Sequence, residues 1–169
     1  MEIKAYAKIN LYLDVTAKRA DGYHDIVSIM QTVDLYDKVS VRIIESESAE
    51  IVLHCGADLP CDGRNLAYKA AERYFAGQVP CKIEIDIQKH IPMQAGLAGG
   101  SADCAAVLRA LNAYFGKYSE SELIDLGAHL GADVPFCLVG GTRITRGIGE
   151  VMQACTPMPD CYLVIARGG

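Results

Sequence analysis

Apolar and polar residues alternate most regularly at the start of the chain. From Ile3 to Leu13 every second residue is apolar, while Lys8 and Asn10 belong to the other, polar series. A period of two is typical of a β-strand with one buried face. We therefore predict a strand over this segment, with Lys8 and Asn10 side by side on the face opposite the core. Residues 81–89 alternate in the same way and are predicted to form another strand.

Capping residues indicate where helices begin and end. Helices are expected at Leu66–Phe75, at about Ala102–Phe115 and at about Glu120–Leu130. Asn65 is suited to cap the first helix and Gly77 to close it. Gly116 is expected to end the second helix. Ser119 and Glu122 have the spacing of a capping box at the start of the third.

Shorter apolar stretches bounded by turn residues predict the remaining strands. These strands are expected near Ile26–Val33, Val39–Ile44, Ile51–His54, Thr142–Arg146 and Tyr162–Ala166. The chain thus begins with strands, continues with a helix and a strand, and then has two helices. This order favours an α+β fold with a mixed or antiparallel sheet over repeated βαβ units.

Composition is that of an ordinary globular protein. The 169 residues are 51% hydrophobic and 22% charged, a balance that excludes disorder and coiled coil as descriptions of the whole chain. No apolar run approaches the ~18 residues that a membrane-spanning helix needs, and the polar start of the chain is unlike a signal peptide. We expect one domain, or one and a part, in the cytoplasm and without a membrane partner.

Charge and cysteine usage narrow the classes of ligand. The formal net charge is −5 and no run of Lys or Arg stands out, whereas nucleic-acid-binding surfaces are usually basic. No nucleic-acid partner is therefore expected. The seven cysteines are odd in number, lie in apolar stretches and include no CxxC pair. This pattern favours buried free thiols over a disulfide framework or a metal site, and no residue is assigned as a metal ligand.

The stretch from Pro92 to Ser101 is rich in glycine and lies between a predicted strand and a predicted helix. Glycines at positions 96, 99 and 100 let backbone N–H groups approach a ligand closely, and a helix N-terminus favours phosphate. The stretch matches neither GxGxxG followed by a βαβ unit nor GxxxxGK[ST]. From the glycines alone two interpretations stay open, namely a phosphate-binding loop and a tight turn that Ser101 caps.

Polar side chains at three further places are candidates for chemistry. Asp133, within Gly-Ala-Asp-Val-Pro-Phe, can accept a proton from a substrate hydroxyl, although Asp is also common in turns and helix caps. Lys8 is either a solvated strand residue or a cationic site residue. Tyr23 and His24 can stack on and hydrogen-bond a base, or Tyr23 can simply pack. None of these positions decides the function alone.

Four segments together resemble one kinase superfamily in their residues, order and spacing: AKINL (7–11), RADGYH (19–24), PMQAGLAGGS (92–101) and LGADVP (130–135). Over nearly its whole length the chain is similar to the galactokinase, homoserine kinase, mevalonate kinase and phosphomevalonate kinase (GHMP) superfamily. The first two segments resemble the branch that phosphorylates 4-diphosphocytidyl-2-C-methyl-D-erythritol. The resemblance implies a two-layer α+β domain of mixed or antiparallel sheet and helices, like domain 2 of ribosomal protein S5.

The resemblance implies ATP-dependent phosphorylation, with Mg²⁺, of a hydroxyl on a cytidine diphosphate-linked small molecule in the non-mevalonate route to isoprenoid precursors. It also implies that Asp133 is the catalytic base and Lys8 its cationic partner, and that Asn10, Tyr23 and His24 bind the substrate. The nucleotide-binding positions that it implies are Asn65, Lys89, Pro92, Met93, Gln94, Ala95, Gly96, Leu97, Ala98, Gly99, Gly100, Ser101 and Ala102.

The chain departs from the family pattern in its loop and in its extent. Ala98 stands where Gly is usual and Ala102 where Ser is frequent; if position 98 needs a positive φ, alanine costs about 1 kcal/mol of strain. The family has a second α/β half, so residues 1–169 are expected to be the N-terminal ATP- and substrate-binding domain without the C-terminal domain. Apolar surface meant for that half would be exposed and would favour a homodimer.

Two other functions stay open at this point. A sister kinase acting on homoserine or a mevalonate-type substrate would share the glycine loop, whereas Tyr23 and His24 favour a substrate that carries a base. A non-catalytic RNA- or protein-binding module of the same fold belongs to a different class, and the acidic balance argues against RNA.

Overall fold

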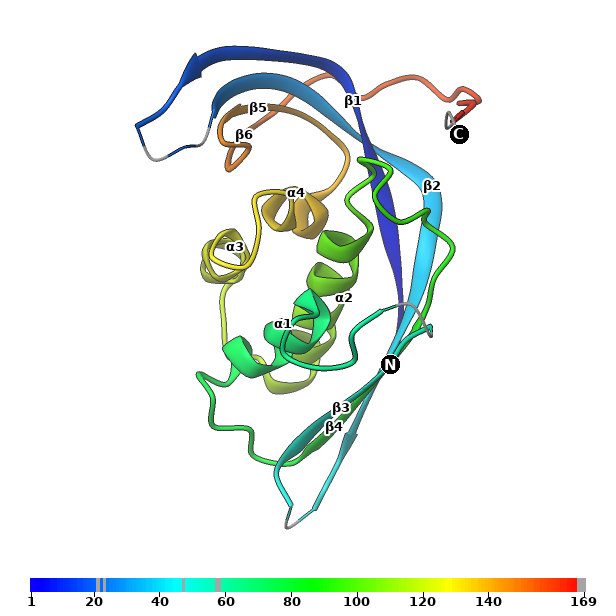
Figure 1. Cartoon of the computed structure of the whole chain (residues 1–169), viewed down its shortest axis with the longest axis vertical. Coiled ribbons are helices and arrows are strands. Elements are labelled where there is room, and N and C mark those ends of the chain that lie inside the picture. The colour runs from blue at the N-terminus through cyan, green and yellow to red at the C-terminus, as the bar shows by residue number, and fades with distance from the viewer. Residues whose placement is uncertain (21, 23, 47, 57–58, 167–169) are drawn as a thin grey trace.

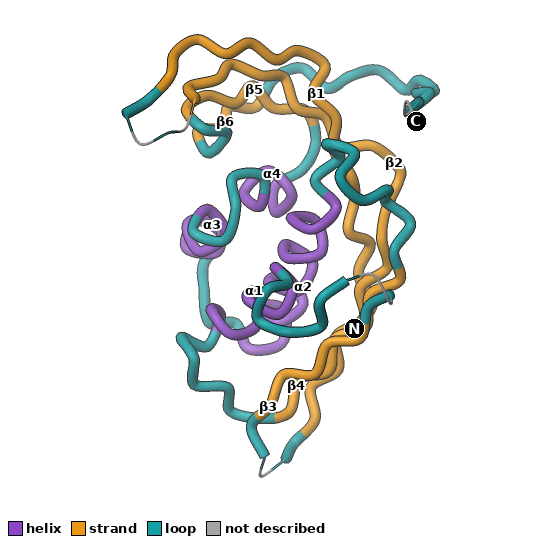
Figure 2. Tube along the Cα trace, viewed as in Figure 1, coloured by secondary structure: helices purple, strands orange, loops and turns teal. Residues whose placement is uncertain are grey.

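The long alternating segments form a sheet that curves around the helices. The structure is a computed structural model and describes residues 1–20, 22, 24–46, 48–56 and 59–166. Its strands are β1 (Glu2–Lys18), β2 (His24–Ile44), β3 (Glu50–His54), β4 (Lys82–Gln88), β5 (Thr142–Gly147) and β6 (Val151–Ala154). Its helices are α1 (Leu66–Tyr74), α2 (Gly99–Phe115), α3 (Glu120–Ala128) and α4 (Val134–Val139). The helices lie on the concave side of the sheet (Figures 1 and 2), so the predicted α+β class is confirmed.

Strand β2 is the centre of the sheet. One edge of β2 pairs antiparallel with β1, and the other edge pairs with β5 at Ile26–Gln31 and with β4 at Lys38–Ile44. β3 adds to β4 in parallel and β6 adds to β5 antiparallel, so the sheet is mixed. The prediction of two strands, Ile26–Val33 and Val39–Ile44, is wrong, because the structure has one. No Gly or Pro lies between them to interrupt the pairing.

The apolar face of β1 is buried only in its first half. Ala7 is fully buried and Ile9 is half-buried, but Leu11 and Leu13 are 45% and 55% exposed. The pairing register with β2 shifts at three places along β1. Such irregularities turn the residues that follow them relative to the core, so the predicted single buried face does not extend to Leu13.

Three of the predicted helix caps are confirmed, whereas the C-cap of α1 is Phe75 and not Gly77. The side chain of Asn65 accepts a hydrogen bond from the N–H of Ala67 (2.9 Å) at the start of α1. Ser119 and Glu122 form the reciprocal capping box of α3. Gly116 ends α2 in the left-handed conformation, with a φ of 61°. Each cap satisfies backbone groups that the helix itself leaves unpaired.

Several predicted boundaries are wrong. α2 begins at Gly99 rather than near Ala102, because the last glycines of the loop already have helical backbone. α3 ends at Ala128 rather than Leu130. Residues 162–166 form no strand with any segment that the structure describes. The sequence prediction also lacks β6 and α4, which span only 4 and 6 residues and therefore show little periodicity.

The hydrophobic core fills the space between the sheet and the helices. Its fully buried large side chains include Ile83 and Ile85 of β4 and Leu108 and Leu111 of α2, each worth roughly 1.5–3 kcal/mol when removed from water. The prediction of buried thiols is confirmed at positions 81 and 104 and wrong at positions 61 and 161, where the cysteines are exposed. Among the helices of the described residues, none combines the length and the apolar character needed to cross a bilayer.

Candidate active site

The glycine-rich stretch forms a loop that is attached to β1. Its residues 92–98 lie in the connection between β4 and α2, and the N–H of Lys8 donates a hydrogen bond to the carbonyl oxygen of the buried Leu97 (3.1 Å). Gln94, Gly96 and Ala98 have φ values of 54°, 72° and 58°. Position 98 thus requires the left-handed conformation, and alanine there carries about 1 kcal/mol of strain.

The N-terminus of α2 opens directly from this loop. Its N-cap residue is Ala98, which supplies no side-chain cap. Ser101 lies inside the first turn, so the interpretation of Ser101 as the cap is wrong. Uncapped N–H groups and the positive end of the helix dipole favour an anion such as phosphate. Gly100 is exposed and a Cβ there would meet nothing nearer than Leu66 Cδ1, at 3.9 Å, so this turn offers open backbone.

Lys8 and Asp133 meet beside the loop. The Nζ atom of Lys8 lies 3.7 Å from Oδ2 of Asp133, and their side chains are 8% and 31% exposed. Lys8 is therefore not a solvated strand residue. The structure brings a nearly buried ammonium group from β1 to a carboxylate that solvent or a ligand can still reach.

Asp133 stands at the N-cap of α4 without acting as a cap. Its backbone has φ −88° and ψ −10°, and its side chain makes no capping hydrogen bond. Pro135, the second helical residue, has no N–H to donate and removes one of the usual capping partners. The carboxylate is thus free of the local role that Asp often has and faces Lys8 instead.

A short hydrogen-bond chain orients Lys8. Its Nζ donates to Oδ1 of Asn10 (2.9 Å), and Nδ2 of Asn10 donates to Oγ of Ser28 (2.7 Å). The hydroxyl of Ser28 donates to the carbonyl of Tyr12 (2.6 Å), and Ser28 is fully buried. Asn10 is therefore next to Lys8, as the alternation predicts, and a contact of Asn10 with substrate stays a prediction.

A buried ionic cluster contacts the segment that leads into the loop. Nζ of Lys89 contacts Oδ2 of Asp37 and Oδ2 of Asp103, the latter at 2.7 Å. Oδ1 of Asp37 accepts the N–H groups of His90 (2.5 Å) and Ile91 (2.8 Å), just before the loop. Two carboxylates share one ammonium in this cluster. Burial, with the nearby Asp37, raises the pKa of Asp103 to about 7 in spite of the contact with Lys89.

Lys8, Lys89, Asp133 and residues 91–99 line a cavity of about 320 Å³. A second cavity of about 320 Å³ lies elsewhere, between α2, α3 and α4, and is lined mostly by apolar residues with Arg109 and Glu120. We place the candidate site at the first cavity, because it joins an ammonium, a carboxylate and an open helix N-terminus.

The other predicted site residues lie at different places in the fold. Asn65 is engaged as the cap of α1, whose next residue, Leu66, faces Gly100. His24 is the first residue of β2, and the start of β2 lies away from the segment that leads into α2 in Figure 1. Tyr23 lies outside the described residues. The structure thus brings together Lys8, Asn10, Asp133 and the loop, but not His24.

Sequence reasoning missed Asp37 and Asp103. Both are buried, at 0% and 3% exposure, and neither belongs to a recognisable motif. A signal was available for Asp103, since it interrupts an otherwise apolar helical stretch, and a charged residue at such a position needs a buried partner. Ser28, which holds Asn10, had no comparable signal.

Comparison with known proteins agrees with this geometry. Residues 65–141 match the family described as GHMP kinases N terminal domain. A protein of Caldicellulosiruptor saccharolyticus named 4-diphosphocytidyl-2-C-methyl-D-erythritol kinase is 52% identical over 99% of this chain, and one of Clostridium botulinum (strain Eklund 17B) with the same name is 50% identical over 99%. The chain spans only 58% and 60% of the length of these two relatives.

Solved structures show the same fold. The crystal structure of a 4-(cytidine 5'-diphospho)-2C-methyl-D-erythritol kinase superposes with a TM-score of 0.76 and 39% identity, covering 94% of this chain and 55% of that one. The crystal structure of the Methanococcus jannaschii mevalonate kinase superposes with a TM-score of 0.68 and 15% identity, covering 92% of this chain and 56% of that one. At this identity the likeness shows the fold alone.

Proposed function

We propose that this chain, whose residues 65–141 match the family described as GHMP kinases N terminal domain, carries the ATP site and the catalytic base of a kinase. The proposed reaction moves the γ-phosphoryl group of ATP to a hydroxyl of 4-diphosphocytidyl-2-C-methyl-D-erythritol, in the non-mevalonate route to isoprenoid precursors. The observation that carries the proposal is the Lys8–Asp133 pair, 3.7 Å apart, beside the uncapped N-terminus of α2.

The glycine loop and the first turn of α2 are proposed to hold the ATP phosphates. The uncapped N–H groups after Ala98 are the donors that phosphate oxygens need, and the exposed Gly100 leaves room for their close approach. The rest of the nucleotide would extend towards the start of α1, where Leu66 faces this turn and Asn65 is fixed as the cap.

Magnesium is proposed to arrive with the nucleotide. The described residues hold no group of three or more side chains that could bind a metal ion by themselves. Asp133 is the carboxylate that lines the cavity beside the loop. One carboxylate fits Mg²⁺, because this ion usually keeps several waters and is bound through substrate phosphates with one or two carboxylates. When bound, the ion neutralises charge on the phosphates.

Asp133 is proposed to take the proton of the substrate hydroxyl. Its carboxylate makes no capping hydrogen bond and lines the cavity next to the loop, and such a positioned base contributes typically ~10²–10⁴-fold to a rate. Lys8, held by Asn10, places a positive charge where negative charge develops on the transferring group. Positioning and electrostatics are the main demands of phosphoryl transfer.

An extended substrate with a base fits the hairpin. In the pairing register His24 lies opposite Lys18, ten residues along β1 from Lys8. The arch of β1 and β2 passes over α3 and α4 (Figure 1), so a substrate seated at Asp133 would reach the hairpin only if it were long. A cytidine diphosphate ester is long and carries a base for His24, whereas homoserine is short and has none. This favours the cytidine-linked substrate over that of a sister kinase.

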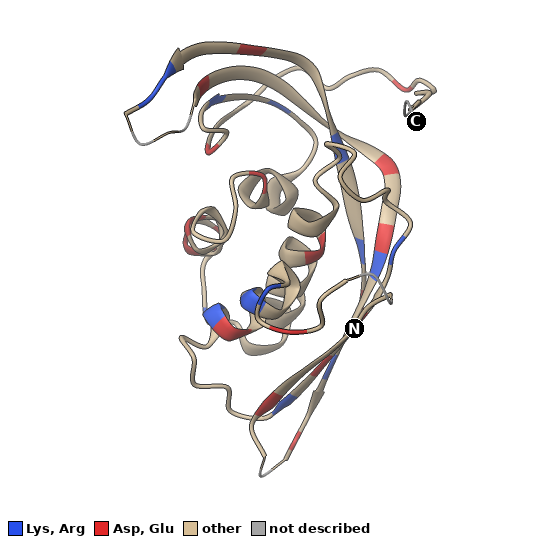
Figure 3. Cartoon of the chain, viewed as in Figure 1, with Lys and Arg blue, Asp and Glu red and all other residues tan. Residues whose placement is uncertain are grey.

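An RNA-binding role has less support. Figure 3 shows Lys and Arg interspersed with Asp and Glu along the strands and helices. With a net charge of −5, counterion release would contribute little to binding a phosphate backbone.

A homodimer is proposed through exposed apolar residues of the hairpin, among them Leu11, Leu13 and Val15. Light scattering that finds only monomer would remove that part of the proposal.

The test is release of ADP from Mg-ATP in the presence of 4-diphosphocytidyl-2-C-methyl-D-erythritol, homoserine or phosphomevalonate. It is run with this chain and with a form extended to the length of the relatives, each beside an Asp133→Asn variant. We expect release only with the cytidine-linked alcohol and its loss in the variant. Release with another alcohol would transfer the assignment to a sister kinase. Absence of ADP release with all three alcohols in the extended form would refute the kinase proposal.

A further inference from the structure

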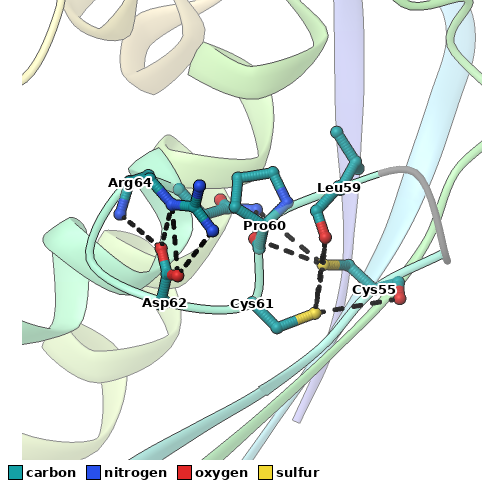
Figure 4. A network of polar contacts seen from close by, with 7 residues as sticks. Cys55, Leu59, Pro60, Cys61, Asp62 and Arg64 are labelled. Atoms are coloured by element: carbon teal, nitrogen blue, oxygen red, sulfur yellow. Dashed lines mark hydrogen bonds and ion pairs between the residues drawn. The ribbon is translucent and has the colours of Figure 1, made fainter.

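Two cysteines face each other in the connection between β3 and α1. The Sγ atoms of Cys55 and Cys61 are 2.9 Å apart (Figure 4), less than 1 Å beyond the length of a disulfide bond of about 2.05 Å. Both are free thiols in the structure. Only a small shift of either side chain is needed for a covalent bond between them.

The surrounding loop holds this arrangement in place. The thiol of Cys55 points to the carbonyls of Leu59 (3.8 Å) and Pro60 (3.6 Å), and Cys61 makes a similar contact with the carbonyl of Leu59 (3.7 Å). Figure 4 shows the two sulfurs approaching from the two ends of the loop. Nδ2 of Asn65 donates to the same Pro60 carbonyl (3.0 Å), so the loop is also tied to the start of α1.

The two thiols differ in accessibility. Cys61 is exposed, whereas Cys55 is half-buried. Burial and the contact with Cys61 raise the pKa of the Cys55 thiol to about 12, with a further upward contribution from Asp103 and an opposing one from Lys89. Cys55 is thus a poor first nucleophile at neutral pH. An oxidant from solution reaches Cys61 first.

We propose that Cys55 and Cys61 form a reversible thiol–disulfide site, in which small-molecule disulfides such as glutathione disulfide oxidise the pair. This site is separate from the phosphoryl-transfer chemistry and does not depend on it. A lone exposed cysteine would keep the small thiol as an adduct, whereas a neighbouring thiol at contact distance expels it.

The reaction has two exchange steps. The Cys61 thiolate attacks one sulfur of glutathione disulfide, so a Cys61–glutathione bond forms, the glutathione S–S bond breaks and one glutathione leaves as a thiolate. Cys55 then gives up its proton to solvent, its sulfur attacks Sγ of Cys61, and the second glutathione leaves. In sum the two protein thiols are oxidised to one disulfide, and one glutathione disulfide is reduced to two glutathione molecules.

The sequence makes the product easy to detect. Both cysteines lie in the peptide that trypsin releases between Arg42 and Arg64, with no Lys or Arg between them. Oxidation therefore makes this one peptide lighter by two hydrogen atoms. A protease that cuts before Asp58 separates the cysteines into two fragments, which stay joined only if the disulfide links them.

The experiment treats the folded chain with glutathione disulfide, quenches with acid and maps the peptides without reduction. Three proteins are compared: the unaltered chain, Cys55→Ser and Cys61→Ser. The exposed Cys161 serves in each as an internal measure of adduct formation at a cysteine outside the pair. Circular dichroism confirms that each protein is folded before treatment.

In the unaltered chain we expect the Cys55–Cys61 peptide to be internally linked and Cys161 to carry glutathione. In Cys55→Ser, the adduct on Cys61 should accumulate at least ~10-fold more than in the unaltered chain, because no second thiol expels it. In Cys61→Ser, Cys55 should stay free. Equal adduct on Cys61 with and without Cys55, or links from this pair to other cysteines or to a second chain, would overturn the proposal. The unaltered chain alone decides the outcome if a variant fails to fold.

Discussion

Replacement of Asp103 by asparagine tests the buried cluster below the glycine loop. Asp103 is 3% exposed, contacts Lys89 at 2.7 Å and shares it with Asp37, while its Oδ1 atom has no hydrogen-bond partner among the described residues. With both carboxylates ionised the cluster holds one more negative than positive charge at a largely buried position. Burial disfavours the charged carboxylate of Asp103, and the nearby Asp37 adds to this, which is why the pKa of Asp103 rises in spite of Lys89.

The size and sign of the effect follow from linkage. Burial raises the pKa of Asp103 from its ordinary 3.8 to about 7. Between these two values the folded chain binds more protons than the unfolded chain, so the free energy of unfolding falls as pH rises through this window. From pH 5 to pH 8 the loss amounts to about 2–3 kcal/mol, at 1.36 kcal/mol for each pH unit within the window.

Urea unfolding followed by circular dichroism at several pH values between 5 and 8 measures this loss. Asparagine keeps the shape of aspartate and does not titrate, so Asp103→Asn should lose about 2–3 kcal/mol less than the unaltered chain over this interval. Asp125→Asn, at an exposed position of α3, removes a carboxylate of the same type and should leave the pH dependence unchanged. If Asp103→Asn and the unaltered chain lose stability in parallel, Asp103 stays ionised beside Lys89 throughout and our account of the cluster is wrong.

Three further predictions concern backbone conformation and helix caps. Ala98→Gly should raise the free energy of unfolding by about 0.5–1 kcal/mol and leave ATP affinity equal or tighter, since φ is 58° there; weaker ATP binding in a titration would contradict this. Asn65→Ala should lower thermal stability by about 1 kcal/mol, because the N–H of Ala67 loses its acceptor; Asn65→Asp, which keeps an acceptor, should recover most of it. Ser119→Ala should cost a similar ~1 kcal/mol through loss of the capping box with Glu122, and an unchanged melting temperature would count against that role.

Local patterns predicted much of the fold, because the interactions that they report are local. Caps such as Asn65 and Ser119 act within three residues, and the strict alternation of residues 81–89 corresponds to β4. The α4 helix was missed because 6 residues hold too little periodicity. Residues 162–166 alone are apolar enough for a strand, but strand formation depends on a partner, which their own sequence does not encode.

The candidate site was predictable in its members but not in its arrangement. Alternation alone placed Lys8 beside Asn10, and the loop followed from its glycines. The burial of Lys8 depends on the register shift in β1 and on its contact with Leu97, which are long-range features. The side chain of Asp133 makes no capping hydrogen bond, and this depends on the position of Asp133 at the start of α4 and on Pro135, which has no N–H. The cluster of Asp37, Lys89 and Asp103 joins three segments distant in sequence, so no local pattern could reveal it.

The loop and the first turn of α2 are proposed to bind the phosphates of ATP. Calorimetric titration of Mg-ATP into the unaltered chain and into Gly100→Ala tests this proposal most directly. The fold has room for the added methyl group, whose nearest neighbour would be Leu66 Cδ1 at 3.9 Å, and alanine favours a helix by up to ~1 kcal/mol. The variant should therefore be at least as stable as the unaltered chain.

We predict that the unaltered chain binds Mg-ATP and that Gly100→Ala binds it about 10-fold or more weakly. The methyl group keeps a phosphate from the backbone N–H groups, and each lost hydrogen bond to a charged group costs ~1.5–3 kcal/mol. Equal affinity in the two proteins, with both folded, would contradict the claim, and so would absence of binding to the unaltered chain.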